Sequence, residues 1–519
     1  MSTRKIRSRE AEPHGTGDVE DRFPRWPTLD AAPGGHCCYK TGTAAMVQKS
    51  VLTNSVFNMA GQLLARLLAL GFYAVFARVL GPERNGDQGF GAAVGTVCVV
   101  LLEPGLNMLL VRDAARDRAS LPTLLAQALG YKLTLLLLVW PVSVGLCLLL
   151  GTPSSVVWAV AFAGGTVLLG AVEDLAAAAL SALERLDLEG VLRVASKALT
   201  AGLGLLALWL HGGFEVTLGA VTAGAVAAAG VGLWMVARTG VAVTVQLAPV
   251  VMARRIGLAW PLAVHNLLWL LTLRLDQLLA SAMGQPHEAL GAYNAAVKTV
   301  EALLLFPSAV ALAFQARVAR ASVEGDDAAS AQLTLAAAAL LAVSIPVTAG
   351  GGVLAGPLAV LIFGQRFDAT GPLLAIQLLA LPLVGIQALG AYTAVAAGRT
   401  RLQALATAVN LVTNVVLNLV LVPRLGMVGA SVAAVVGGAV ACVVYVGGLW
   451  RLRLGVALLA GAWRPLVAAG AMVGGLWLLG LQTLPLLVTV AVGAVLYAAV
   501  FVTLGGLRVV KALAQARRE

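Results

Sequence analysis

Three cations lie deep inside apolar stretches of the sequence, where a charged side chain is costly. They are Arg66, Arg274 and Lys298, and each surrounding stretch reaches the roughly 20 residues that a helix needs to cross a bilayer. A charge at such a position normally faces a bundle interior or a water-filled cavity. Arginine binds phosphate through its planar fork, and lysine binds it as a point charge. The three cations therefore predict a site for an anionic group within a membrane.

The same cations have a simpler alternative role, which is neutralisation by acids of the protein itself. Lys298 precedes Glu301 by three residues, a spacing that brings two side chains together on one helix face. Arg274 stands two residues before Asp276, and an acid of another helix is an equal candidate for its partner. The residue types leave both roles open.

The composition of the whole chain requires a membrane around these stretches. Only 12% of the residues are charged, 59% are hydrophobic and the mean hydropathy is +0.89, whereas about a quarter of the residues in a soluble domain are charged. Apolar windows of about 20 residues recur from residue 50 almost to the end, and we count fourteen of them. The expected fold is an all-α polytopic membrane protein with about fourteen transmembrane helices.

Basic residues concentrate in alternate connections between the apolar stretches, as they do in cytoplasmic loops. An even number of spans places both termini on the same side, and the position of the basic residues makes that side cytoplasmic. The net charge of +11 is mostly this bias, so it gives no reason to expect a nucleic-acid partner. Lys132, Arg193 and Lys197 lie nearer the cytoplasmic edge of their spans, where snorkelling to the headgroups is the expected explanation.

The amino-terminal segment and the cysteines indicate no further site. Residues 1–50 are polar and lack an apolar core, which predicts a disordered cytoplasmic tail and not a signal peptide. The five cysteines form no CxxC pair, so neither a metal site nor a cofactor is expected. The absence of a P-loop and of a GxGxxG motif gives no support for ATP hydrolysis or dinucleotide chemistry.

One segment of the chain is repeated after 203 positions. Without a gap, Gly81 aligns with Gly284, seven of 22 consecutive positions are identical, and Pro104 aligns with Pro307. Six predicted helices separate the copies, and an even number restores the same orientation. The repeat therefore predicts two parallel six-helix lobes about an axis along the membrane normal, with a substrate site between them.

Three stretches in order resemble a known family. They are ARVLGPERNGDQGFGAAV with EPGLNMLLVRDAAR, then RLDQLLASAMGQPHEALGAYNAAVKTVEALLLFP, and then AAGRTRLQALATAVNLVTNVVLNLVLVPRLGMVGASVAAVV. Together they are similar to the polysaccharide-transport (O-antigen flippase) branch of the multidrug/oligosaccharidyl-lipid/polysaccharide (MOP) exporter superfamily. The resemblance implies a central cavity lined chiefly by helices 1, 2, 7 and 8. It also implies a flippase that moves a polyprenyl-pyrophosphate-linked oligosaccharide across the bilayer.

The resemblance gives the charged residues candidate roles. Arg66, Arg274 and Lys298 are candidates for contact with the pyrophosphate, because they lie on helices 1, 7 and 8. Asp276, Glu301 and Glu103 are candidates for coupling to protons or sodium ions, or for balancing charge. The adjacent acids Glu173 and Asp174 fit a shared pocket less well, because neighbouring helix residues point about 100° apart.

Two prolines and three asparagines complete the set of candidates. Pro104 and Pro307 are candidate hinges, because a proline within a span frees a carbonyl and permits a bend. Asn410, Asn414 and Asn418 recur every four residues and share one face of a helix. Hydrogen bonding between helices is the expected use of these amides, and contact with sugar hydroxyls is the alternative.

These predictions divide the chain into a tail, two lobes, a linker and a final helix pair. The expected location is the bacterial cytoplasmic membrane, and the expected partners are the lipid-linked glycan, the bilayer and a polysaccharide polymerase or export machinery. The boundaries are a tail at 1–50, an N-lobe at 51–237, a cytoplasmic linker at 238–256, a C-lobe at 257–450 and two helices with a cytoplasmic end at 451–519.

Three other functions remain open. A multidrug exporter of the same superfamily often carries an acid on helix 1, but no Asp or Glu occurs between Val51 and Leu80. A lipid II flippase has an Arg-Asp pair at the end of helix 1, which LALGFYAVFARVLG lacks. A membrane polysaccharide polymerase or ligase needs a large outside loop with catalytic polar residues, whereas the outside loops predicted here are short.

Overall fold

Helices make up almost all of the regular structure in the computed structural model, which describes residues 41–450, 454–480 and 485–506. These described residues contain no strand. The chain forms two units, Met1–Val51 and Leu52–Glu519, and the first contributes only the beginning of helix α1 (Thr41–Leu102) to the description. The prediction of an all-α polytopic membrane protein is confirmed.

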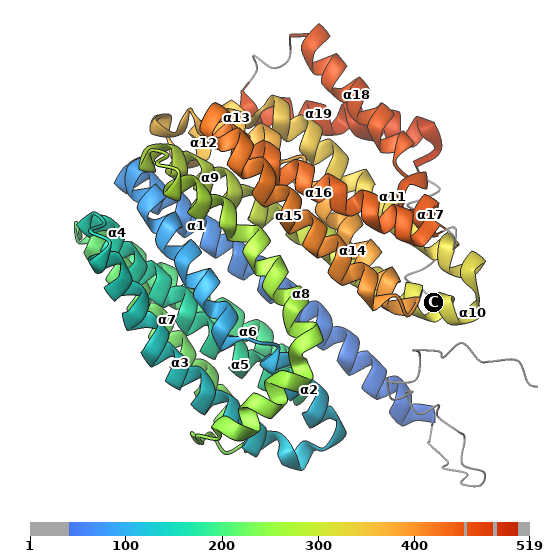
Figure 1. Ribbon diagram of the computed structural model, residues 1–519. Helices are drawn as coiled ribbons and strands as arrows, with labels where there is room; N and C mark the ends of the chain where they lie inside the picture. Colours follow the sequence, from blue (N-terminus) through green and yellow to red (C-terminus); the bar gives the residue numbers. More distant parts are fainter. Residues whose placement is uncertain (1–40, 451–453, 481–484, 507–519) are drawn as a thin grey trace, which may run out of the picture. The chain divides into compact units, whose positions relative to one another are not determined.

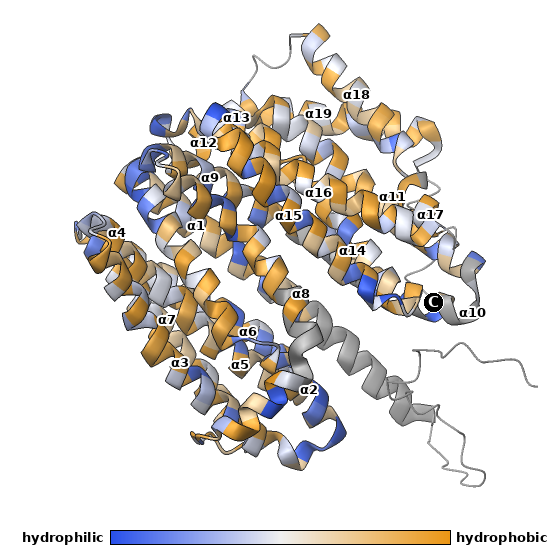
Figure 2. Cartoon of the chain, in the orientation of Figure 1, coloured by the Kyte–Doolittle hydropathy of each residue, from blue (hydrophilic) through white to orange (hydrophobic). Residues whose placement is uncertain are grey.

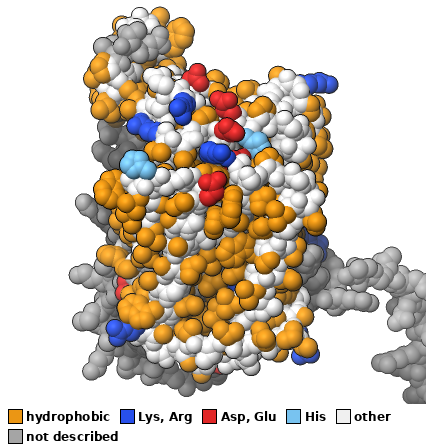
Figure 3. Space-filling view, turned by 90° about the vertical axis from the view of Figure 1, so that its left-hand side faces the viewer, with side chains coloured by type: hydrophobic (Ala, Val, Ile, Leu, Met, Phe, Trp, Pro, Cys, Tyr) orange, Lys and Arg blue, Asp and Glu red, His pale blue; other side chains and the backbone are white. Residues whose placement is uncertain are grey.

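Eleven helical segments among the described residues are long and apolar enough to cross a membrane. One of them, Phe57–Arg116, has 60 residues, which is about three times the length of a single crossing. Large apolar side chains stand on the outside of the bundle, and Figure 3 shows them covering the middle of one face, with charged side chains near its edges. Lipid is the solvent that such a surface requires. The chain is a multi-pass membrane protein, and the count of fourteen crossings stays a prediction.

The first half of the chain forms a bundle with its own core (Figure 1). Buried leucines of α2, α3 and α5, among them Leu125 and Leu175, pack with α7 into one apolar cluster. A π-helical turn, Val160–Gly164, joins α4 to α5. The helices after α1 are α2 (Leu106–Arg116), α3 (Leu121–Leu149), α4 (Ser154–Ala159), α5 (Gly165–Ala182), α6 (Leu186–Trp209) and α7 (Phe214–Arg238).

The second half forms another bundle, and its largest core draws on residues after position 310 alone. The last helices, α18 and α19, add apolar side chains to this core. Figure 2 shows how apolar residues dominate these helices along most of their length. The helices are α8 (Pro249–Ala282), α9 (His287–Leu303), α10 (Leu305–Glu324), α11 (Asp326–Val353), α12 (Ala355–Phe363), α13 (Thr370–Gln377), α14 (Ala380–Ala396), α15 (Thr400–Leu425), α16 (Met427–Leu449), α17 (Leu454–Ala460), α18 (Trp463–Leu478) and α19 (Leu486–Phe501).

The two copies of the sequence repeat share two backbone features. Gly81 and Gly284 both adopt a left-handed conformation, with φ of 83° and 77°, which glycine tolerates because it has no Cβ. Further along, the helix is interrupted at 103–105 in the first copy and at Leu304 in the second. Pro104 lies in the first interruption, and Pro307 follows the second by three residues. Their role as hinges stays a prediction.

The connection between the halves is partly helical. Helix α7 ends at Arg238 and α8 already begins at Pro249, so the last part of the predicted linker 238–256 continues into a helix. The Gln246 amide donates to the Ala126 carbonyl at 3.0 Å, which holds the connection against α3. Gly130 permits this contact, because a Cβ there would lie 2.3 Å from the Gln246 carbonyl oxygen. The domain boundaries themselves stay a prediction.

Candidate anion-binding cavity

A cavity of about 580 Å³ lies between the two halves of the bundle, with walls from α1 and α5–α7 on one side and α8–α10 and α14 on the other. Arg66, Arg274 and Lys298 all line it. Lys197 of α6 lines it as well, and Glu301 of α9 is the one carboxylate among its described lining residues. Four cations against one carboxylate give the wall a formal charge of +3. The structure therefore brings together all three cations predicted for pyrophosphate contact.

Glu301 contacts three of the cations. Its Oε1 lies 2.8 Å from Arg274 Nη2 and its Oε2 lies 2.8 Å from Lys298 Nζ. Its main-chain oxygen accepts a 3.3 Å hydrogen bond from Arg66 Nη1. The carbonyls in the last turn of a helix have no partner within that helix, and they attract cations. The pairing expected for Lys298 is present, and the partner of Arg274 is an acid of another helix and not Asp276.

Lys197 is a site residue that the sequence prediction assigned to the membrane edge. The structure shows instead that it lines the cavity, and no described residue forms an ion pair with it. A second cavity of about 300 Å³ shares Arg66 and Lys197 with the first and is also lined by Glu189 and Arg193. This second cavity therefore continues from the main one along α6.

The remainder of the wall combines flat apolar rings with hydroxyl groups. Such a mixture suits a ligand that presents both apolar faces and hydrogen-bonding groups. The rings belong to Phe72, Tyr73, Phe76 and Trp269, and the hydroxyls to Thr96, Thr166, Thr200 and Ser308.

Helices α1 and α9 touch where Gly86 of α1 meets Gly291 of α9. We call this contact the Gly86–Gly291 crossing. The Asn85 side chain donates to the Gly291 carbonyl at 2.8 Å, and His287 Nδ1 lies 2.6 Å from Asp87 Oδ1. A Cβ on Gly86 would lie 1.9 Å from the main-chain oxygen of His287, so the two backbones are in direct contact.

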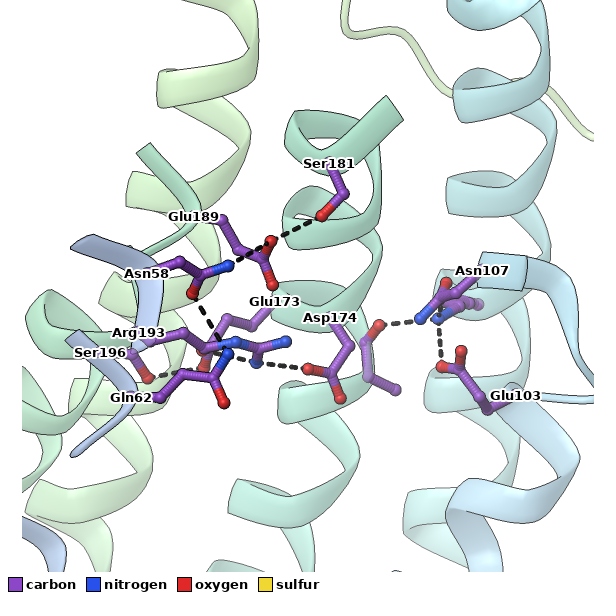
Figure 4. A network of polar contacts seen from close by, with 12 residues as sticks. Asn58, Gln62, Glu103, Asn107, Glu173, Asp174, Ser181, Glu189, Arg193 and Ser196 are labelled. Carbon is purple, nitrogen blue, oxygen red and sulfur yellow. Dashed lines mark hydrogen bonds and ion pairs between the residues drawn. The ribbon is translucent and has the colours of Figure 1, made fainter. Parts of the chain in front are cut away.

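Figure 4 shows a second set of buried charges, which lies within the first half of the chain. Lys132 is fully buried, and its ammonium donates to Glu103 Oε2 at 2.6 Å, to Asn107 Oδ1 at 3.0 Å and to the Ala171 carbonyl at 2.8 Å. The prediction that Lys132 snorkels to the headgroups is therefore wrong, because three acceptors satisfy it inside the protein. The same contacts place Glu103 away from the main cavity.

Arg193 joins the two neighbouring acids of α5 (Figure 4). Its Nη1 lies 3.3 Å from Glu173 Oε1 and 2.5 Å from Asp174 Oδ1. Ser196 donates to the other oxygen of Glu173 at 2.6 Å. The two acids do share a pocket despite their angular separation on the helix, because one guanidinium reaches both. This network also rules out free snorkelling for Arg193.

The remaining polar candidates lie in the packing between helices. Asp276 is buried and accepts from the Tyr293 hydroxyl and from the Gln277 amide, so it does not line the cavity. Asn418 donates to the Asn414 carbonyl at 2.8 Å, and Asn410 donates to a glutamine of α14 at 3.5 Å. No asparagine of this row is among the described residues that line the cavity. Of these contacts, that of Asn410 joins two helices and that of Asn418 lies within α15, so the role of these amides between helices stays a prediction.

A helical bundle whose two halves enclose a charged cavity is the architecture of a MOP-type membrane transporter. Comparison with protein families supports this class. The family model described as "Polysaccharide biosynthesis protein" matches residues 51–316, which is more than half of the chain, and the model described as MatE matches residues 261–420. The chain belongs to the polysaccharide biosynthesis protein family, in the polysaccharide branch of the MOP exporter superfamily, and it is a transporter and not an enzyme.

Solved structures share the fold at low sequence identity. "Lipid II flippase MurJ, inward closed conformation" has a TM-score of 0.71 at 13% identity, covering 86% of this chain and 98% of that one. A MOP superfamily transporter from Pyrococcus furiosus has a TM-score of 0.54 at 16% identity, with coverages of 78% and 96%. An inward-facing multidrug resistance MATE family transporter has a TM-score of 0.54 at 15% identity, with coverages of 78% and 95%. No curated protein sequence matches the chain significantly.

Proposed function

We propose that this transporter is a flippase for a polyprenyl-pyrophosphate-linked oligosaccharide and moves it across the bacterial cytoplasmic membrane during polysaccharide assembly. The observation that carries the proposal is the cavity between the halves, whose wall holds Arg66, Lys197, Arg274 and Lys298 against one carboxylate. Both termini are cytoplasmic in this proposal, and a polysaccharide polymerase or export machinery receives the glycan.

The charge of the cavity decides between the substrates that such a bundle could carry. An ionised group moved into hydrocarbon without a partner costs on the order of tens of kcal/mol, so a pyrophosphate needs a lined path. Arginine forks and a lysine ammonium provide charge-assisted hydrogen bonds to phosphate oxygens. The polyprenyl tail needs no such path because it is as apolar as the lipid. A cavity with a formal charge of +3 disfavours the cationic drugs of a multidrug exporter.

The cavity walls also carry groups that suit a sugar. Phe72, Phe76 and Trp269 supply flat apolar surface, while Thr96 and Thr200 supply hydroxyl groups. A lipid II flippase binds a pyrophosphate of the same kind, so the cations alone do not separate the two substrates. A transport measurement with both lipid-linked head groups separates them.

The first test removes the cations that have no carboxylate partner. Arg66→Gln and Lys197→Gln are each expected to slow translocation about 10- to 100-fold, because a hydrogen bond to a charged group contributes about 1.5–3 kcal/mol. Neither change leaves an orphaned acid among the described residues. The measurement is access of a quencher to a fluorescent polyprenyl-pyrophosphate oligosaccharide in proteoliposomes.

Three controls accompany this measurement. Arg238→Gln changes an exposed cation at the end of α7 that does not line the cavity, and it should leave the rate unchanged. A pyrophosphate-linked muropeptide and a lipophilic drug cation serve as rival substrates. Unchanged rates for folded Arg66→Gln and Lys197→Gln would refute the proposed site, and faster transport of either rival would assign the other substrate.

We also propose that a proton or sodium gradient drives the transport. Glu301 and Glu103 are the candidate coupling acids, since both line cavities, whereas Asp276 is enclosed by Tyr293 and Gln277. Imposing a pH or sodium gradient across the proteoliposomes should accelerate net transport in one direction. A rate that responds to neither gradient would mean that the flippase only equilibrates its substrate.

A further inference from the structure

The carboxylate of Glu301 lies in the cavity wall and binds two of its cations. Both of its oxygens are bound, one by Arg274 and one by Lys298, each at 2.8 Å. The side chain is 32% exposed, so it stands at the cavity surface and is not sealed into the packing. Arg274 and Lys298 each bind one oxygen of the same carboxylate. The same two cations are suited to bind two oxygens of one phosphate group.

The cations of the two halves differ in their partners. Arg274 and Lys298, from α8 and α9, share the Glu301 carboxylate. Arg66 and Lys197, from α1 and α6, have no acid partner in the described part of the chain, and Arg66 reaches only the main-chain oxygen of Glu301. An incoming anion therefore meets two available cations on one side and two occupied cations on the other.

We propose that Glu301 is an internal competitor for the substrate anion, an inference that rests on the proposed function. The pyrophosphate docks first on Arg66 and Lys197 and then displaces the Glu301 carboxylate from Arg274 and Lys298. When the carboxylate returns to these cations, the phosphate is released. No covalent bond changes in this exchange, since one carboxylate and one phosphate group trade places on the same donors.

An internal competitor prevents the four cations from binding the substrate anion too tightly for release. A translocation site must bind its ion well enough to admit it and weakly enough to release it. Four unopposed cations in a site of low dielectric would hold a pyrophosphate tightly, because Coulomb attraction grows as the effective dielectric falls. Glu301 lowers the net affinity by the strength of its own two contacts, without removing either cation.

The test is the affinity of the full-length protein in nanodiscs for inorganic pyrophosphate, measured by calorimetry. Glu301→Gln should bind pyrophosphate roughly tenfold or more tightly than the unaltered protein, because two charge-assisted contacts no longer compete. The same variant should translocate the lipid-linked oligosaccharide more slowly over many turnovers, since release becomes limiting. Glu288→Gln, which changes an exposed acid at the start of α9, should alter neither quantity.

Glu301→Asp keeps the charge and draws the carboxylate back by one methylene, so it serves if Glu301→Gln does not fold. It should tighten pyrophosphate binding by a smaller factor. Unchanged or weaker binding in the folded variants would overturn the competitor role. The proposed function would still stand in that case if the unaltered protein binds pyrophosphate and Arg66→Gln weakens this binding. If the unaltered protein does not bind pyrophosphate at all, the proposed function fails instead.

Discussion

Replacing Gly291 with alanine is expected to part the two halves of the bundle at the Gly86–Gly291 crossing. The new Cβ would lie 1.8 Å from the main-chain oxygen of Pro82, a backbone atom that cannot rotate away. Overpacking of this kind costs about 1–3 kcal/mol, which changes a conformational ratio about 5- to 150-fold. The population in which the two helices touch should therefore fall by that factor relative to the separated one, and transport should fall with it.

The measurement is the distance between spin labels placed at Glu83 and Glu288, which are both exposed and lie on α1 and α9. Gly291→Ala should shift the distance distribution towards longer values. Gly71→Ala is the matched control on α1, because a Cβ there meets no other atom within 4 Å. Identical distributions for Gly291→Ala and the unaltered protein would show that the crossing does not hold the halves together.

Replacing Lys132 with methionine is expected to be the most destabilising single change in the first half of the chain. The ammonium is fully buried and satisfies Glu103, Asn107 and the Ala171 carbonyl at once. Methionine fills a similar volume but leaves the Glu103 carboxylate without its cation. Removal of one partner from a buried ion pair costs about 3–5 kcal/mol.

Thermal unfolding of the purified protein measures this effect as a fall in the midpoint temperature. Lys132→Met combined with Glu103→Gln should recover part of the loss, because the second change removes the unpaired charge. Arg112→Gln breaks the exposed pair with Asp113 and should cost no more than about 1 kcal/mol. A midpoint for Lys132→Met equal to that of Arg112→Gln would contradict the structural role of the buried ammonium.

The three cavity cations could be predicted from the sequence, because a charged side chain within an apolar span normally faces the bundle interior or a water-filled cavity. Lys197 was available to the same argument. It is the twelfth residue of the 24-residue helix α6, so at 1.5 Å per residue it lies near the middle of a span of about 30 Å. It was left out of the predicted site because it was assigned to the membrane edge and because its helix was not among the expected cavity helices 1, 2, 7 and 8.

Other contacts depend on how segments far apart in the sequence pack together, so no short sequence pattern predicts them. The three acceptors of Lys132 come from two separate parts of the chain, residues 103–107 and Ala171. The contact of Arg193 with both Glu173 and Asp174 depends on how α6 lies against α5. The Lys298–Glu301 pair was predictable, because a spacing of three residues on one helix decides it.

The two copies of the sequence repeat share a glycine with positive φ but differ in their distribution of charge. A shift of 203 positions places Gly71 opposite Arg274 and Gly95 opposite Lys298, while Trp269 stands opposite Arg66. The paired halves therefore supply different residues to one cavity. This asymmetry is what gives one side of the wall available cations and the other side cations bound by Glu301.

The contact between Gly86 and Gly291 also sets the kind of motion that can open it. Main chain touches main chain there, so no rotamer change of a side chain, which takes picoseconds to nanoseconds, can admit a substrate. Whole helices must move apart together, and collective motions of that size occur over microseconds to milliseconds. Separation of these two helices is therefore a microsecond-to-millisecond event, however quickly the anion exchanges between its cations.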